Sequence, residues 1–309
     1  MPVRSAYWTA EKFAKELKVE LGADFHSQVG QLILSTGEVR ELVWAHSRWS
    51  NTELIEISSI SDGVKKLRDR TSKLYAMAPL NHVRRATLID DQLGNKAAKA
   101  RLKKPIQFLE PRRPSLAQFG LIEPGLMIAS PETSSWVPQG EMQFIESPVA
   151  PSRAYLKLWE LFTMEGFHPL KNETCLDLGA SPGGWTWVLA KLGANVTSID
   201  KADLAPEVAR MPGVKQLKKD AFRLKPSEIG PLDWLFSDVI CEPRRLLELV
   251  HEWRESGLCK NFVCTIKFKG ETDFSVLGDF LKIEGSHARH LFHNKHEVTW
   301  WSLDPHKEK

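Results

Sequence analysis

Cysteine is scarce in this chain of 309 residues, with four in all, and none of them belongs to a C-x-x-C pair. Disulfide-rich scaffolds and cysteine-based zinc sites both need closely spaced cysteines, so the sequence excludes these two classes of protein. Cys175 and Cys264 fall in expected strands, where a thiol packs as a small apolar group. No histidine stands at metal-ligand spacing from a cysteine, and we expect no metal site.

Long apolar runs are also missing, since none approaches the roughly 20 residues that a membrane-spanning helix needs. The first residues, MPVRSAYWTAEKFAKEL, contain no apolar core followed by a small-residue cleavage site, which predicts no secretion signal. The composition, 42% hydrophobic and 26% charged, is typical of globular proteins. We therefore expect a cytoplasmic protein without a membrane partner, long enough for two domains with separate cores.

The net charge of +3 is small but unevenly distributed. Residues 61–120 contain 14 Lys or Arg against 5 Asp or Glu, so the remainder of the chain is acidic. A basic block of this kind is typical of a surface that binds a nucleic-acid backbone, although a solvated basic loop has the same composition. The eight cations that we expect to contact RNA are Lys65, Lys66, Arg84, Arg85, Lys103, Lys104, Arg112 and Arg113.

Turn-forming residues divide the chain near residue 150. The stretch 95–113 is basic and interrupted by Pro105 and Pro111, which predicts a loop or arm. Pro- and Ser-rich passages at 129–141 and 146–153 predict a domain boundary, giving domains at 1–150 and 151–309. The first is expected to be a small α+β RNA-binding domain, with helices at 10–21 and 61–77 and strands at 31–35, 41–45 and 54–57.

Strands and helices alternate after the boundary. Helices are expected at 153–164, 185–192, 243–255 and 273–282, and strands at 174–178, 196–199, 214–218, 234–239, 262–268, 288–292 and 298–303. Such alternation predicts an α/β fold whose mostly parallel, doubly wound sheet is covered by helices on both faces. The last two strands are joined by HNKHE, which predicts a hairpin and an antiparallel final strand.

The segment CLDLGASPGGWTWVLAKLGANVTSID, residues 175–200, combines a strand, a Gly-rich turn, a helix and a second strand ending in Asp200. This series is a nucleotide-binding βαβ unit. Its turn is not the dinucleotide pattern G-x-G-x-x-G, and Pro182 lacks the N–H that a phosphate would need. The pattern D-x-G-x-x-P-G-G-[WF] instead resembles motif I of the FtsJ-like S-adenosylmethionine (SAM) methyltransferases.

This resemblance implies a Rossmann-like class I methyltransferase domain that methylates ribose 2′-hydroxyls of RNA. Within the family, the chain is most similar to the bacterial enzymes of type M that modify a cytidine of 23S ribosomal RNA, through APSR-x-x-LKL, DLGA-x-PGGWT and L-[FY]-H-x-x-x-EVT. Large-subunit rRNA is therefore the expected partner. The N-terminal residues match the THUMP-containing part of those enzymes only in REL-x-WA, so a THUMP-like and a ferredoxin-like domain both stay open.

The family's Lys-Asp-Lys-Glu catalytic tetrad corresponds here to Lys157, Asp238, Lys267 and Glu297. Lys269 is the alternative to Lys267, one strand repeat away. A neutral lysine can remove the proton of a ribose hydroxyl, and neighbouring positive charge from the first lysine and the SAM sulfonium favours that neutral form. The two carboxylates would orient the amines. Individually, each lysine is equally compatible with an ordinary surface residue.

The resemblance also implies a set of SAM contacts: Gly179, Ala180, Ser181, Pro182, Gly183, Gly184, Trp185, Asp200, Asp220 and Asp238. The three glycines are expected to let the cofactor approach the backbone. Asp220 has a structural alternative as an N-cap of the next turn, and Trp185 as a packing residue. His293 and His296 are expected in a solvated turn, and Trp44, Trp49 and Trp136 would stack RNA bases if they were exposed.

Two alternatives to this function stay open. One is a SAM-binding RNA assembly factor without turnover, which would have no need of the tetrad. The other is a 2′-O-methyltransferase of tRNA or of an mRNA cap. Methylation of a base amine is disfavoured, because the chain has SDVICEP after the expected strand 234–239 instead of the [DN]-P-P-[YF] loop that orients a planar amine.

Overall fold

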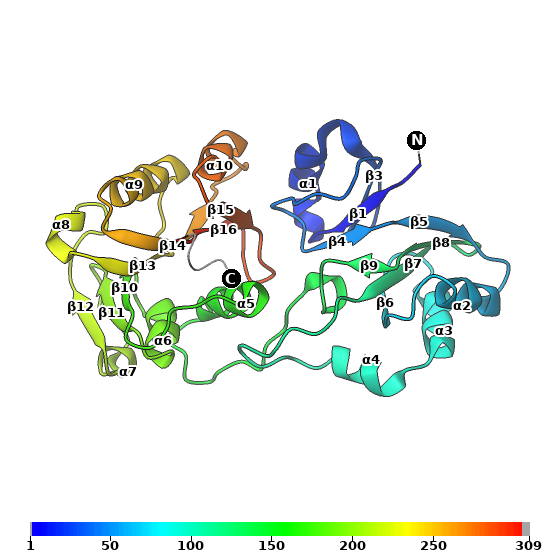
Figure 1. The fold of residues 1–309 in the computed structure, drawn as a ribbon, viewed down its shortest axis with the longest axis horizontal. Helices are drawn as coiled ribbons and strands as arrows, with labels where there is room; N and C mark the ends of the chain where they lie inside the picture. Colours follow the sequence, from blue (N-terminus) through cyan, green and yellow to red (C-terminus); the bar gives the residue numbers. More distant parts are fainter. Residues whose placement is uncertain (1, 305–309) are drawn as a thin grey trace. The chain divides into compact units, whose positions relative to one another are not determined.

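Two units, Met1–Phe144 and Ile145–Lys309, divide the chain in the computed structural model, which describes residues 2–304 (Figure 1). Each unit has its own sheets and its own core. Among the described residues, no helix combines the length and the apolar character needed to cross a bilayer.

Unit 1 contains two sheets. The five-stranded sheet has the order β2-β3-β1-β4-β9, and the four-stranded sheet has the order β5-β8-β7-β6. The strands are β1 (Ser5–Trp8), β2 (Phe25–Val29), β3 (Leu32–Ser35), β4 (Ser47–Ser50), β5 (Glu53–Glu56), β6 (Tyr75–Met77), β7 (Ala117–Glu123), β8 (Leu126–Ser130) and β9 (Glu132–Thr133). The helices are η1 (Glu11–Phe13), α1 (Ala14–Leu21), η2 (Gly22–Asp24), α2 (Ile60–Arg68), α3 (Val83–Leu93), α4 (Lys96–Leu102) and η3 (Pro138–Gly140).

The alternation of side chains along β8 explains how the layers of unit 1 pack. Met127 and Ala129 belong to a core shared with the apolar faces of α2 and α3. Ile128, which points to the opposite face, packs in a second core with Trp8 of β1 and Trp49 of β4. Successive residues of a strand face opposite sides of the sheet, so β8 has helices on one side and the five-stranded sheet on the other.

The strand predicted at 41–45 is wrong, because these residues form a loop held by a helix side chain. The carboxylate of Glu20, in α1, accepts hydrogen bonds from the N–H groups of Val43 and Trp44, each at 2.9 Å. Both residues are buried. The apolar run LVWA is therefore buried without a partner strand, because the Glu20 carboxylate accepts the hydrogen bonds that a neighbouring strand would otherwise accept.

Two further expectations for unit 1 are wrong in part. The helix predicted at 61–77 ends at Arg68, and its last residues form β6, which pairs in parallel with β7. That partner lies some 40 residues further along the chain, so no local pattern marks the strand. The stretch 95–113, predicted as a loop, contains helix α4.

Unit 2 is a seven-stranded sheet of order β12-β11-β10-β13-β14-β16-β15. Its strands are β10 (Thr174–Leu178), β11 (Asn195–Ile199), β12 (Val214–Leu217), β13 (Leu232–Ser237), β14 (Cys259–Lys267), β15 (Ser286–Arg289) and β16 (Glu297–Ser302). Its helices are α5 (Tyr155–Glu165), α6 (Gly184–Lys191), α7 (Pro206–Ala209), α8 (Pro226–Ile229), α9 (Pro243–Glu255) and α10 (Phe274–Leu281). In Figure 1, α5 and α6 lie on one face of the sheet, and α9 and α10 on the other.

This sheet confirms the predicted α/β fold. The pairs from β12 to β14 are parallel, whereas β16 is antiparallel to both β14 and β15. The chain runs outward from β10 in both directions, first to β11 and β12 and then to β13 and β14. Ligands of open α/β sheets bind at the carboxyl ends of strands where the order reverses in this way, here between β10 and β13.

Replacing Glu20 with Ala should destabilise unit 1 by about 2–4 kcal/mol, because the buried N–H groups of Val43 and Trp44 lose the carboxylate that accepts from them. Glu11→Ala, at an exposed position before α1, is the matched control and should change stability by less than about 0.5 kcal/mol. Denaturant-dependent hydrogen exchange of peptides from residues 2–144 measures the free energy of unfolding of unit 1 in both variants. Equal stability of the two variants would contradict the role given to Glu20.

Candidate functional site

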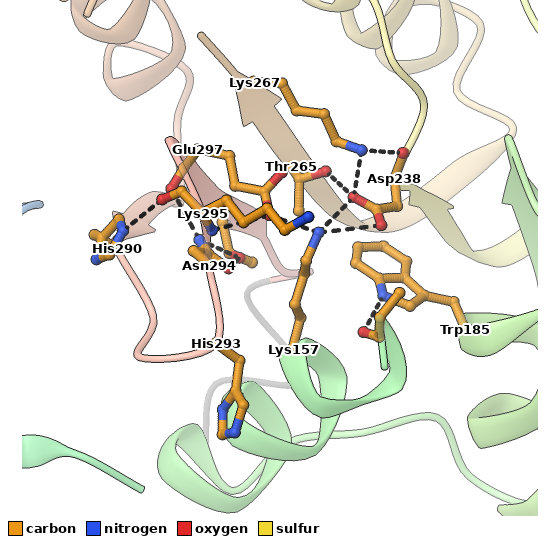
Figure 2. Close-up of polar contacts among 12 residues, drawn as sticks. Lys157, Trp185, Asp238, Thr265, Lys267, His290, His293, Asn294, Lys295 and Glu297 are labelled. Carbon is orange, nitrogen blue, oxygen red and sulfur yellow. Dashed lines mark hydrogen bonds and ion pairs between the residues drawn. The ribbon is translucent and has the colours of Figure 1, made fainter. Parts of the chain in front are cut away.

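The register of three neighbouring strands brings the four predicted catalytic residues together. Asp238 follows the last residue of β13, whose Ser237 pairs with Cys264 of β14. Lys267 ends β14 and is the direct partner of Glu297, the first residue of β16. Lys157 reaches the same place from the first turn of α5, below the sheet (Figure 2).

The carboxylate of Asp238 is the centre of the cluster. Lys157 Nζ lies 2.9 Å from Asp238 Oδ1 and 2.6 Å from Glu297 Oε1. Lys267 Nζ lies 2.9 Å from the same Oδ1 and donates to the backbone carbonyl of Asp238 at 2.6 Å. Thr265 Oγ1 donates to Oδ1 as well, at 2.5 Å. Two ammonium groups thus share two carboxylates.

The electrostatics of the cluster keep Lys157 charged. Burial lowers the pKa of Lys157, but Asp238 and Glu297 outweigh it and raise this pKa above its ordinary value of 10.5. Burial likewise raises the pKa of Asp238, yet Lys157, Lys267 and the Thr265 hydroxyl hold it below 3.8. Lys267 has the most exposed side chain of the four residues, at 20%, followed by Asp238 at 16%.

Lys269, the alternative to Lys267, lies outside the cluster. It follows the end of β14, and its ammonium group pairs with Glu242 at 3.0 Å while 71% of its side chain stays exposed. The cross-strand pairing of Lys267 with Glu297 therefore favours Lys267 as the second lysine.

The Gly-rich turn after β10 packs against the protein itself. A Cβ atom at Gly179 would lie 2.9 Å from Val239 Cα, and one at Gly184 would lie 2.5 Å from Ser152 Oγ. Gly179 is therefore required by the fold, because the Cβ would meet backbone and its φ is +75°, whereas the Ser152 hydroxyl beside Gly184 can rotate away. Ala180, Ser181, Pro182 and Gly183 complete the turn between β10 and α6.

Trp185 connects this turn to the helix that carries Lys157. Its side chain is buried and its Nε1 donates to the carbonyl of Ala154, the N-cap residue of α5, at 3.0 Å (Figure 2). Trp185 thus packs between the turn and α5.

Three acidic side chains follow the carboxyl ends of parallel strands in unit 2. Asp200, after β11, accepts from the N–H groups of Ser181 and Ala202, each at 2.9 Å. Asp220 accepts from the N–H of Phe222 and pairs with Lys201, and these contacts lower its pKa. With Asp238, which follows β13, they lie at the same edge of the sheet as the reversal between β10 and β13. This edge offers backbone groups of the glycine turn and carboxylate acceptors, a set of polar groups that fits the amino acid and ribose parts of SAM.

The histidines near the end of the chain are not solvated as expected. His293 Nδ1 lies 2.7 Å from Glu160 Oε2, and His296 Nε2 lies 3.0 Å from Thr272 Oγ1. Glu160, in α5, is buried. Neither Glu160 nor Thr265 appears among the predicted site residues. The only sequence signal for them is spacing. Glu160 comes three residues after Lys157 in a helix, and Thr265 comes two residues before Lys267 in a strand, so each shares a face with a predicted lysine.

The predicted RNA-binding cations of unit 1 divide into two sets. Lys65, Arg84, Lys103, Lys104 and Arg112 are exposed. Lys66, Arg85 and Arg113 are half-buried; Lys66 pairs with Asp62, and Arg113 pairs with Glu110 and stacks on Trp136. Trp44, Trp49 and Trp136 are buried, so the condition for their stacking on bases is not met.

Part of the chain is similar to known methyltransferases. Residues 150–274 match the family described as FtsJ-like methyltransferase. A relative named Ribosomal RNA large subunit methyltransferase M from Halorhodospira halophila is 35% identical over 158 residues, which is 48% of this chain and 46% of the relative. The protein of the same name from Tolumonas auensis is 31% identical over 220 residues, 64% of this chain and 59% of the relative. The chain thus spans about half of these relatives' length.

Among solved structures, a SAM-dependent methyltransferase from Agrobacterium tumefaciens covers 51% of this chain and 64% of its own at 15% identity. Its TM-score is 0.38, too low for any conclusion about function.

Replacing Lys157 with Met should destabilise unit 2 by about 3–5 kcal/mol at pH 7, because two buried carboxylates lose a cation of the cluster. The fold lowers the pKa of Asp238 and raises the pKa of Lys157. The extra stability of the wild type over Lys157→Met is therefore fully present between about pH 3.8 and about pH 10.5, the ordinary pKa values of the two groups. It should fade as the pH falls through the carboxyl range. Thermal unfolding at several pH values measures it.

Lys269→Met is the matched control, since it removes an exposed ion pair that is worth at most about 1 kcal/mol. A Lys157→Met deficit that stays constant from pH 3 to pH 7 would contradict the assigned ion pairs.

Proposed function

We propose that this chain, whose residues 150–274 match the FtsJ-like methyltransferase family, transfers a methyl group from SAM to a ribose 2′-hydroxyl of RNA. The observation that carries the proposal is the Lys157–Asp238–Lys267–Glu297 cluster beside the reversal of strand order. A weakly acidic hydroxyl needs a base and accurate placement, and this cluster offers both.

Lys267 is the proposed base. Its Nζ donates to the carbonyl and the carboxylate of Asp238, which fixes the direction of the amine. When neutral, it has a lone pair that accepts the hydroxyl proton, and that proton leaves later to solvent. Bound SAM supplies the methyl group on a positively charged sulfonium. Lys157, which stays charged, shares the Asp238 carboxylate with Lys267.

Asp238 and Glu297 act as orienting groups in this proposal. A lysine side chain is a mobile four-carbon stem, and a buried carboxylate restricts it. Gly179–Gly184, Asp200 and Asp220 would hold SAM. Methylation of a base amine has no support, because the residues after β13, DVICEP, do not form the [DN]-P-P-[YF] loop that orients a planar amine.

The proposed substrate is large-subunit rRNA in the cytoplasm. The support comes from the names of the two relatives and from the basic block in unit 1. We propose that the exposed cations of residues 65–113 contact RNA phosphates while unit 2 carries out the chemistry, whether unit 1 is THUMP-like or not.

Lys267→Ala should reduce single-turnover methyl transfer by at least about 100-fold while the Kd for SAM, measured by calorimetry, stays within about twofold. In this proposal Lys267 accepts the proton of the ribose hydroxyl and does not contact SAM, so SAM affinity should be unchanged. Lys269→Ala is the matched control and should keep the wild-type rate. If Lys269→Ala lost activity and Lys267→Ala kept it, the assignment of the base would be wrong.

The double variant Lys103→Glu, Lys104→Glu should weaken RNA binding. It should also reduce the magnitude of the slope of log K against log salt concentration by about 1–2, because binding releases fewer counterions when phosphate contacts are lost. Lys12→Glu with Lys15→Glu makes the same change of charge at exposed residues outside the basic block. Fluorescence anisotropy with labelled RNA compares the two. Identical salt slopes in both variants would show that the basic block has no special role.

A further inference from the structure

The loop that leads into Glu297 is attached to helix α5 by a buried carboxylate. Glu160 is 2% exposed, and its two oxygens accept three N–H groups. The donors are the backbone N–H of Phe292 at 2.7 Å, the backbone N–H of His293 at 3.0 Å and the ring Nδ1 of His293 at 2.7 Å. A carboxylate is an acceptor only, so this bond assigns the proton to His293 Nδ1.

The same loop is braced internally up to Glu297. His290 Nε2 bonds the carbonyl of Lys295 at 2.9 Å, and Asn294 Nδ2 donates to the carbonyl of Glu297 at 3.1 Å (Figure 2). The Asn294 amide also bonds Thr299 of β16. Phe292 and His293 therefore lie within a segment that is hydrogen-bonded to itself and to the backbone of Glu297.

Helix α5 holds this loop at two points. Lys157 and Glu160 are three residues apart and lie on one face of the helix. Lys157 pairs with the side chain of Glu297, while Glu160 binds the backbone at 292–293. The first contact belongs to the cluster around Asp238, and the second contains no residue of that cluster.

We propose that Glu160 is a positioning residue for the methyl transfer: with His293 it fixes the loop so that Glu297 meets Lys157 Nζ. The proposal rests on the proposed function. Burying a carboxylate destabilises the fold unless its oxygens accept hydrogen bonds. Here the N–H groups of Phe292 and His293 donate to both oxygens of Glu160. The imidazole of His293 covers the carboxylate, whose side chain is 3% exposed.

The chain provides a matched control on the same helix. Glu165, at the end of α5, pairs with Arg289 of β15 at 3.1 Å. It connects α5 to β15, one of the strands that flank the loop, whereas Glu160 binds the loop itself. A general loss of packing between α5 and the hairpin should affect both glutamates alike, whereas positioning should affect Glu160 alone.

The test is single-turnover methyl transfer at saturating RNA and SAM, with SAM affinity measured separately. Glu160→Ala should lose about 10- to 100-fold in rate, as supporting residues around a site commonly do, with SAM affinity unchanged within about twofold. Glu160→Gln retains one acceptor oxygen and should recover part of the rate. Glu165→Ala should stay within about threefold of wild type.

Coupling to Glu297 distinguishes positioning from destabilisation. If Glu160 acts through Glu297, then adding Glu160→Ala to Glu297→Ala should cost less than about threefold further. Additive losses would overturn the proposal, because Glu160 would then act elsewhere. A Glu160→Ala variant with the wild-type rate would overturn it too.

Hydrogen exchange provides a readout that needs no activity. The amides of Phe292 and His293 should lose protection in Glu160→Ala and keep it in Glu165→Ala, and retained protection in Glu160→Ala would overturn the proposal. A wild-type protein that methylates no RNA would instead overturn the proposed function, and the exchange data would still decide whether Glu160 fixes the loop.

Discussion

The buried carboxylate of Asp238 is the contact on which the arrangement of unit 2 around its site depends. It stands after β13, at the reversal of strand order, and receives Lys157 from α5 and both Thr265 and Lys267 from β14. Burial alone would favour a neutral carboxyl, and the two ammonium groups reverse that preference. Asp238 therefore holds a helix and a strand at one point, and its charge is balanced only while both lysines stay there. Glu297 then balances the second cation, so that the four side chains are mutually dependent.

The fold of unit 2 was predictable because its signals are local. Buried strands bounded by Gly and Pro, and helices such as Pro243–Glu255, could be located within a few residues. Unit 1 was harder, since its structure depends on distant partners. The run LVWA has the composition of a strand, yet the Glu20 carboxylate takes its N–H groups. The local sequence predicts that residues 75–77 end a basic helix, but in the structure they form β6 because β7 pairs with them in parallel.

The four residues of the cluster were predictable as a set from motifs, whereas their contacts were not. The choice between Lys267 and Lys269 needed the pairing of β14 with β16, which no single-strand pattern contains. Thr265 and Glu160 were missed for the same reason, because each becomes relevant only through a residue on another element. The histidines of the hairpin were misjudged, since a polar turn suggests solvent and the partners Glu160 and Thr272 are distant in the sequence.

The most direct test of the proposed chemistry is to follow the methyl group itself. Unmodified large-subunit rRNA would be incubated with the protein and SAM labelled with ¹³C in its methyl group, digested to nucleosides and analysed by tandem mass spectrometry. The account predicts a labelled nucleoside whose extra mass stays with the ribose when the glycosidic bond breaks, and no such product with Lys267→Ala. Label that stays with the base would contradict it.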